Sequence, residues 1–342
     1  MFLPKRLVFC GGGTRCLMFA QALVELEKRN RLVAVQDYWG TSAGALVAAL
    51  MAISKSPSRV KEVMFQANYT NWRNFDVANL LNITNTWGLD DGKSLIEEIE
   101  SVFETLQPGS KTKKLADIVG LNIVVSDLNS HETVVVNSQS YPELRVVDAI
   151  RASMSLPLFF RPFRHPTTGH IWVDGAIRAH FPWEALPDDT SRSEALGFTF
   201  EKSWEDGPQT FMEYLFSMIH FDEPRKIQDL RKQWPRNIVW FPPPPYPAWY
   251  VRLKPEDFTM IEKIGLDAAE RWLRLGDDSI QNQGMTGNPP LSDRRHTPSP
   301  SSRQDRTTGM SDTLARPQPL PPQDSLPHPT PNIPRAARRW SV

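Results

Sequence analysis

The chain has 342 residues, in which 39 lysines and arginines are balanced by 39 aspartates and glutamates. A formal net charge of zero excludes the large basic surface that bulk binding to nucleic acid requires, so we expect no nucleic-acid partner. The two cysteines, Cys10 and Cys16, are too few for a disulfide framework and indicate a reducing compartment.

The first 54 residues alternate predicted strands and helices. Apolar and β-branched runs predict strands at 6–10 and 33–39, and proline-free runs predict helices at 14–26 and 43–53. A glycine-containing turn joins each strand to the helix that follows it. Strands that alternate with helices in this way predict an α/β fold.

The second turn, at 40–44, has the Gly-x-Ser-x-Gly pattern of a nucleophile elbow. Gly40 and Gly44 permit a tight bend, and Ser42 is expected in a strained, exposed conformation at a helix N-terminus. The alternative is a glycine-rich turn in which Ser42 only caps the helix. The strand before the turn and the helix after it favour Ser42 as a catalytic nucleophile.

The first turn contains three consecutive glycines. Their backbone N–H groups can turn toward one point and stabilise an oxyanion, so Gly11, Gly12 and Gly13 are the candidate donors. The run lacks the spacing of a dinucleotide fingerprint and the Gly-Lys-Ser/Thr ending of a P-loop, which disfavours nucleotide binding. Arg15 is a candidate contact for a lipid phosphate, and the alternative is a solvated arginine on the first helical turn.

A candidate base lies much later in the chain. Residues 169–173 predict a strand that ends at Asp174-Gly175, and a carboxylate at such a position can be buried and still reach across a cleft. Hydrophobic surroundings would raise its basicity enough to accept a proton from serine. The competing pair, Asp91-Gly92, precedes a helical run and is typical of a surface turn, so we favour Asp174.

The remaining chain predicts mixed structure followed by a tail. Helices are expected at 61–67, 95–103, 146–153, 211–221 and 258–275, and strands at 121–125, 133–136 and 196–200. The segment 240–250 combines four consecutive prolines with aromatic residues, which predicts a rigid loop packed on the domain or an element at a lipid–water interface. Residues 277–342 are rich in Pro, Ser and Arg and predict a disordered tail, with a weak match to ligands of SH3-type domains.

These residues together resemble the patatin-like phospholipase family. The family's glycine loop with a basic residue, its serine elbow and its Asp-Gly-Gly or Asp-Gly-Ala motif correspond to 11–15, 40–44 and 174–176. An Ala-Ile-Arg-Ala-Ser segment at 149–153, followed by proline and phenylalanine, strengthens the match. The resemblance covers about residues 5–190 and implies a domain at 1–276. Cys16 and His180 stand where the family more often has glycine and an asparagine-rich stretch.

The resemblance implies a three-layer α/β/α fold with a mainly parallel central sheet. It also implies a lipid acyl hydrolase in which Ser42 attacks an ester, Asp174 acts as the base and Gly11–Gly13 hold the oxyanion, with Gly40, Gly44 and Gly175 supporting the motifs. No metal, cofactor or catalytic histidine is implied. Residues 56–115 are expected to cover the site, as in the family.

Three alternatives remain open from the sequence. The same Ser–Asp pair serves an acyltransferase or a triacylglycerol lipase. A Ser-His-Asp triad would use His180 or His220 as the base. A non-catalytic lipid-binding scaffold would recruit partners through its proline-rich tail.

The expected location is the cytoplasm, with peripheral contact to a membrane. The apolar run at 7–10 is too short for a signal peptide, and no run approaches the roughly 18 apolar residues of a membrane span. The expected substrate is a phospholipid or another lipid ester.

Overall fold

A sheet of eight strands forms the centre of the computed structural model, which describes residues 2–72, 77–201, 214, 217–218, 223–248 and 250–284. Five of these strands are parallel neighbours, in the order β10 (Ile238–Phe241), β9 (Ala195–Phe200), β1 (Arg6–Phe9), β2 (Asp37–Thr41) and β4 (Leu121–Asp127). Parallel strands need crossover connections, and the helices supply them. The mainly parallel α/β sheet predicted from the sequence is confirmed.

The sheet changes character at β4, which has three partners. β5 (Glu132–Asn137) pairs antiparallel along one edge of β4, from Asn122 to Asp127. The other edge is shared, because β2 occupies residues 121–124 and β8 (Ile171–Asp174) pairs antiparallel with 125–127. β2 and β8 therefore run toward each other along the same edge of β4. β7 (Phe163–Arg164) pairs antiparallel with β8 and forms the edge of the sheet there.

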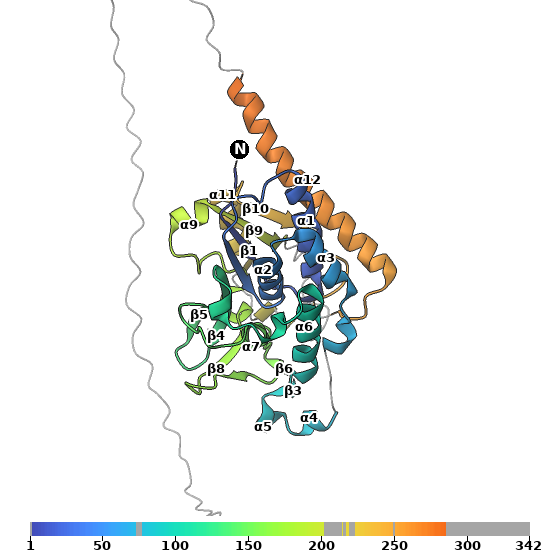
Figure 1. The fold of residues 1–342 in the computed structure, drawn as a ribbon, viewed down its shortest axis with the longest axis vertical. Coiled ribbons are helices and arrows are strands. Elements are labelled where there is room, and N and C mark those ends of the chain that lie inside the picture. The colour runs from blue at the N-terminus through green and yellow to red at the C-terminus, as the bar shows by residue number, and fades with distance from the viewer. Residues whose placement is uncertain are drawn as a thin grey trace, which may run out of the picture. The chain divides into compact units, whose positions relative to one another are not determined.

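Both faces of the sheet are covered. On β1, Leu7 and Phe9 belong to a large core with the helices α1 (Leu17–Lys28), α2 (Ala43–Ser54), α3 (Pro57–Gln66), α6 (Lys93–Leu106), α7 (Val146–Ser153) and α12 (Pro255–Gly284). Val8, which points the other way, belongs to a second core with Trp183 and Ile238, against which Leu230 of α11 (Glu223–Gln233) packs. This alternation follows from the two-residue period of a strand. The result is a central sheet with helices on its two sides (Figure 1).

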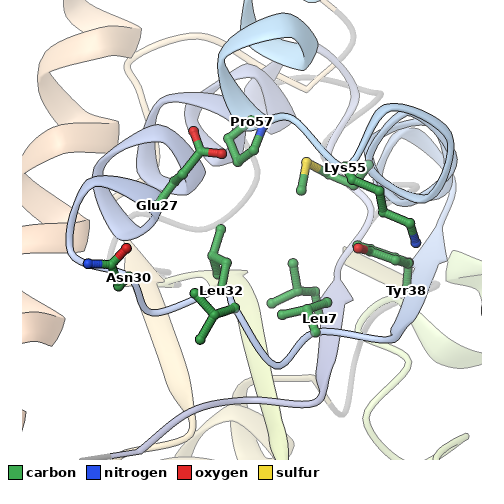
Figure 2. A pocket seen from close by; sticks show the side chains of 10 residues that line it. Leu7, Glu27, Asn30, Leu32, Tyr38, Lys55 and Pro57 are labelled. Carbon is green, nitrogen blue, oxygen red and sulfur yellow. The ribbon is translucent and has the colours of Figure 1, made fainter.

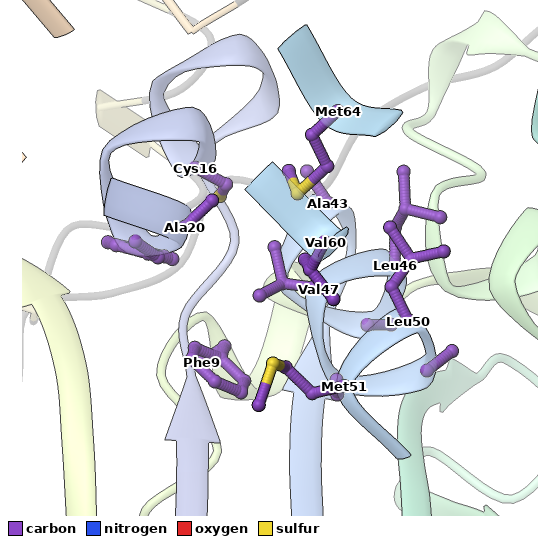
Figure 3. Packing of buried hydrophobic residues seen from close by; sticks show 14 of the residues in the cluster. Phe9, Cys16, Ala20, Ala43, Leu46, Val47, Leu50, Met51, Val60 and Met64 are labelled. Atoms are coloured by element: carbon purple, nitrogen blue, oxygen red, sulfur yellow. The ribbon is translucent and has the colours of Figure 1, made fainter. Parts of the chain in front are cut away.

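α2 is buried on all sides. Every residue from 43 to 52 is buried, and Figure 3 shows Val47 and Met51 of α2 packed among Phe9, Ala20 and Val60 of the neighbouring strand and helices. A helix that is apolar all round is stable only when it is enclosed in this way. The N-terminus of α2 is consequently a fixed platform.

A smaller two-stranded sheet lies apart from the main one. It pairs β3 (Gly88–Asp90) with β6 (Leu158–Phe160) in parallel. Two short helices, α4 (Val77–Leu81) and α5 (Ile83–Thr86), pack against β3, and Figure 1 shows them projecting at the lower end of the unit.

The structure corrects several expected boundaries. The strand expected at 33–39 begins at Asp37 and continues through Gly40 and Thr41, because only 37–41 has partners on β1 and β4. The helix expected at 258–275 is part of α12, which runs from Pro255 to Gly284. The helix expected at 14–26 is a 3-10 turn at Gly13–Cys16 followed by α1. The helix expected at 211–221 lies almost entirely outside the described residues, as does the tail from 285 onward.

Other elements have no counterpart in the prediction. These are β3, β6, β7, β10, α11, α8 (Ala176–Ala179) and α9 (Asp189–Ser193). Among the described helices, none has the length and apolar character needed to cross a bilayer.

Candidate active site

Ser42 occupies the turn between β2 and α2 in a left-handed conformation, with φ 54° and ψ −129°. Side chains with a Cβ rarely adopt this region, and such strain is typical of functional turns. The flanking glycines are required sterically, because a Cβ on Gly40 would lie 2.3 Å from the Gly44 carbonyl oxygen. A Cβ on Gly44 would lie 2.3 Å from the Cys10 carbonyl oxygen. Ser42 thus lies at a strand-to-helix turn with a positive φ, between two glycines that pack closely against backbone.

The Ser42 hydroxyl donates a 2.7 Å hydrogen bond to Asp174 Oδ2. The sheet topology explains how residues 132 positions apart meet. Thr41 at the end of β2 pairs with Val124, and Asp174 at the end of β8 pairs with Val125, so the two strand ends abut on one edge of β4. Gly175 fits this junction because a Cβ there would lie 2.2 Å from the Val124 carbonyl oxygen.

Asp174 is a buried carboxyl group. Only 3% of the residue is exposed, and the second carboxyl oxygen, Oδ1, accepts the Ala176 N–H at 2.8 Å. Burial raises the pKa of Asp174 to about 6, although the hydrogen bonds from Ala176 and Ser42 and the charge of His180 act in the opposite direction. A carboxylate with this pKa is ionised at neutral pH and is more basic than an ordinary aspartate.

The C-terminal end of α7 and the residues directly after it contact both members of this pair. Ser153 Oγ accepts the Ser42 N–H at 2.8 Å and donates to the Val124 carbonyl oxygen at 2.6 Å. Two residues later, the Ser155 carbonyl oxygen accepts the Asp174 N–H at 2.9 Å. The backbones of Ser42 and Asp174 are thus fixed by one short stretch of chain. In the sequence this stretch is visible only as a resemblance to the family, and its contacts with Ser42 and Asp174 are not predictable from it.

The glycine loop lies directly beside Ser42. A Cβ on Gly11 would come within 3.3 Å of both Ser42 Cβ and His180 Cδ2, so a side chain at this position would crowd the serine. The Gly11 N–H donates to the His180 carbonyl oxygen at 2.9 Å. Within the part of the chain that the structure describes, no acceptor pairs with the N–H groups of Gly12 and Gly13.

Arg15 and Thr14 fix the far side of the loop to the proline-rich segment. Arg15 Nε and Nη2 both donate to the Tyr246 carbonyl oxygen, at 3.0 and 2.6 Å, and the Thr14 N–H donates to the Ala248 carbonyl oxygen at 3.2 Å. Tyr246 is buried, and its ring is tilted against that of Tyr250, with ring centroids 5.4 Å apart. Trp240 and Phe241 belong to β10, and residues 242–248 form a loop that packs on the domain through these contacts, as in one of the two interpretations that the sequence left open.

The two candidate histidines are placed differently. The Ser42 hydroxyl donates to Asp174. A Cβ on Gly11 would lie 3.3 Å from both Ser42 Cβ and His180 Cδ2, so the His180 ring is close to the serine. His220 lies outside the described residues. Asp91, the competing carboxylate, is at the start of α6, where it accepts the Lys93 N–H at 3.0 Å and forms an ion pair with the Lys93 side chain.

Cys16 is a buried free thiol, as is Cys10. Burial raises the pKa of the Cys16 thiol, so it stays protonated, and its Sγ donates to the Cys10 carbonyl oxygen. In the described ranges, no three His, Cys, Asp or Glu side chains are arranged to hold a metal ion.

A cavity of about 320 Å³ lies at the opposite end of α2 from Ser42 (Figure 2). Its lining includes Leu7, Tyr38, Met51 and Lys55, and the Lys55 ammonium lies 4.3 Å above the Tyr38 ring. Lys55 caps the C-terminus of α2 and Ser42 its N-terminus, so roughly 18 Å of helix separates them. This cavity is distinct from the Ser42–Asp174 pair.

Comparison with known proteins matches the family model described as patatin-like phospholipase to residues 7–187, which is more than half of the chain. The uncharacterized protein R571 of Acanthamoeba polyphaga mimivirus is 22% identical over 227 residues, covering 63% of this chain and 74% of R571. The uncharacterized protein YqhO of Bacillus subtilis is 25% identical over 267 residues, covering 69% of this chain and 86% of YqhO. The crystal structure of VipD from Legionella pneumophila shares the fold, with a TM-score of 0.53 at 14% identity over 79% of this chain and 67% of VipD.

Proposed function

Because the chain belongs to the patatin-like phospholipase family, we propose that it hydrolyses carboxylic esters of lipids through Ser42 and Asp174. The observation that supports this most directly is the 2.7 Å hydrogen bond from the Ser42 hydroxyl to Asp174 Oδ2. A serine hydroxyl is a weak nucleophile near neutral pH and needs a base within hydrogen-bond reach. Asp174 is such a base, and its raised pKa suits the role.

In the first half of the proposed reaction, Ser42 Oγ forms a bond to the ester carbonyl carbon while its proton moves to Asp174 Oδ2. The carbonyl oxygen becomes an oxyanion. The tetrahedral intermediate then collapses, the ester C–O bond breaks, and the leaving alcohol takes the proton from Asp174. An acyl group remains esterified to Ser42.

The oxyanion needs donors that are fixed before the reaction begins. The N–H groups of Gly12 and Gly13 are the proposed donors, since the Gly11 N–H is engaged by His180. The helix dipole of α2, whose N-terminus follows Ser42, favours negative charge at the same place. Losing one oxyanion donor typically lowers the rate about 10²–10³-fold.

In the second half, a water molecule attacks the acyl carbonyl and gives its proton to Asp174. The Ser42–acyl bond breaks, the fatty acid leaves, and the proton returns to Ser42 Oγ. The Ser153–Ser155 stretch acts throughout by holding the backbones of Ser42 and Asp174.

The test is fatty-acid release from mixed phospholipid vesicles and from a soluble short-chain ester, by wild type, Ser42→Ala and Asp174→Asn. Asp91→Asn is the matched control, because it changes another Asp-Gly pair of the chain, the competing candidate from the sequence. We expect hydrolysis by wild type and Asp91→Asn, and a loss of at least 10³-fold in the other two variants.

Labelling by a fluorophosphonate tests the nucleophile separately. Wild type is expected to be labelled at Ser42, and Asp174→Asn much more slowly. Full hydrolysis by either Ser42→Ala or Asp174→Asn would refute the proposed pair. Acyl transfer to added alcohol in preference to water would instead assign a transacylase to the same residues.

A further inference from the structure

Four large apolar side chains are exposed at the end of the unit where α4 and α5 project. They are Leu80 (58% exposed), Leu81 (90%), Trp87 (48%) and Leu158 (48%), here called the α4–β6 surface. Trp87 directly precedes Gly88, which pairs with Leu158 in the β3–β6 ladder. Asn79 of α4 donates to the Leu89 carbonyl oxygen at 2.9 Å, which holds α4 against β3. Exposed apolar side chains that gather in this way mark an interaction site more often than scattered ones do.

Two arginines border the α4–β6 surface. The sequence has no Asp, Glu, Lys or Arg from 77 to 89, nor from 152 to 160. The next charged residues after β6 are Arg161 and Arg164. Arg164 lies over the Trp87 ring, with its guanidinium carbon 5.8 Å from the ring centroid, and Arg161 donates to the Asn79 side chain at 3.3 Å.

The nearby carboxylates do not offset these arginines. Asp90 is buried and accepts the Gly92 N–H at 2.7 Å, and Asp91 pairs with Lys93. Apolar side chains bordered by arginines complement a bilayer that contains anionic phospholipids. Tryptophan is also the residue most typical of the bilayer interface.

The surface is tied to the proposed active site by a buried arginine. Arg151 of α7 is 4% exposed, and its guanidinium donates to Ser155 Oγ and to the carbonyl oxygens of Asp91 and Arg161. It therefore joins the loop after β3 to the chain after β6. Leu158 follows Ser155, whose carbonyl oxygen holds Asp174, by three residues.

We propose that the α4–β6 surface is where the chain docks on an anionic phospholipid bilayer, and that it delivers lipid to Ser42. The delivery step rests on the proposed function, whereas the docking step does not. Leu80 and Leu81 lie on α4, which projects together with α5 at the lower end of the unit (Figure 1), and this position suits insertion among lipid headgroups. A protein partner is the alternative occupant, and the test separates the two.

The test uses the full chain with Ser42→Ala, so that lipid is not consumed and binding is independent of hydrolysis. Sedimentation with vesicles of phosphatidylcholine and phosphatidylserine measures the partition coefficient. The test variants are Leu81→Asp with Trp87→Asp, and separately Arg164→Glu. Val119→Asp is the matched control, because Val119 is 80% exposed and lies just before β4, at the end of the strand away from Asp174.

We expect the double variant to lower the partition coefficient at least tenfold and Arg164→Glu to lower it about threefold or more. Val119→Asp should leave it unchanged. Arg164→Glu should have little effect on vesicles of phosphatidylcholine alone. Thermal unfolding of each variant checks that it is folded.

The proposal would be overturned if the double variant, Val119→Asp and the Ser42→Ala chain without further substitution all had the same partition coefficient. So would a wild-type dimer or higher oligomer that the double variant dissociates while vesicle binding persists, because the surface would then join copies of the chain. Failure of the proposed function is recognised separately. In that case the wild-type chain, with Ser42 present, would still partition onto vesicles but would not hydrolyse the soluble ester.

Discussion

Replacing Asp174 by asparagine should stabilise the protein at neutral pH while removing the proposed activity. Asparagine has nearly the same shape, its carbonyl oxygen can accept the Ala176 N–H, and its amide can donate to Ser42 Oγ. The substitution therefore keeps the hydrogen bonds of the buried site. The substitution removes only the negative charge of the carboxylate, which is unfavourable in a buried site.

The magnitude follows from the pKa of Asp174, which burial raises from 3.8 to about 6. Below pH 3.8 the carboxyl group is protonated in both the folded and unfolded states, so the charge costs nothing. As the pH rises through 6, Asp174 also ionises in the folded state. Above this pH the buried charge lowers the free energy of unfolding by its full amount, about 3 kcal/mol. The same relation gives an advantage for asparagine of about 1 kcal/mol at pH 4.5 and about 3 kcal/mol at pH 7.5.

The assay is urea unfolding of wild type and Asp174→Asn at pH 4.5 and pH 7.5, with the difference in unfolding free energy compared between the two pH values. Asp91→Asn is the control with the opposite sign. Partial burial acts to raise the pKa of Asp91, but its hydrogen bonds to Lys93 outweigh this and lower the pKa, so that carboxylate favours folding at neutral pH. An Asp174→Asn protein whose relative stability is the same at both pH values, or lower at pH 7.5, would refute the account of Asp174 as a carboxylate destabilised by burial.

Three further results are expected. Hydrolysis of a soluble ester should rise about tenfold per pH unit below pH 6 and level off above it, because Asp174 must be ionised to act as base; a rate that is constant between pH 5 and pH 7 would contradict this. Ser153→Ala should lower kcat about tenfold with little change in KM, since it leaves the Ser42 N–H without its acceptor, and Ser140→Ala on the surface is the control. Gly44→Ala should lower the thermal unfolding midpoint or prevent folding, because its Cβ would lie 2.3 Å from the Cys10 carbonyl oxygen, and a normal midpoint would show that the elbow can relax.

The parts of the site that were predictable from sequence are those set by local geometry. The elbow around Ser42 depends on glycines two residues away on either side, so its pattern is visible in five consecutive residues. The close packing of Gly175 against Val124 requires a glycine at that strand end, so the aspartate before it stands in a recognisable Asp-Gly pair. The parallel sheet followed from the same alternation of strands and helices.

What the sequence did not reveal depends on distant parts of the chain. The contact of Ser153 with the Ser42 N–H exists because the end of α7 passes beside the elbow, which no local pattern records. Arg15 meets the carbonyl oxygen of Tyr246, 231 residues away, rather than solvent. β10 was missed because its four residues adjoin a proline run that dominates the local composition, and they form a strand only by pairing with β9.

The meeting of β2 and β8 on one edge of β4 makes the distance between Ser42 and Asp174 a property of strand registration. A slip of β8 by one residue along β4 would displace Asp174 by about 3.4 Å and turn its side chain to the opposite face of the sheet. Chains that fold with an incorrect alignment would keep most of their secondary structure and lose the hydrogen bond between the pair. The reactivity of Ser42 therefore reports whether β8 has paired with β4 in the native register.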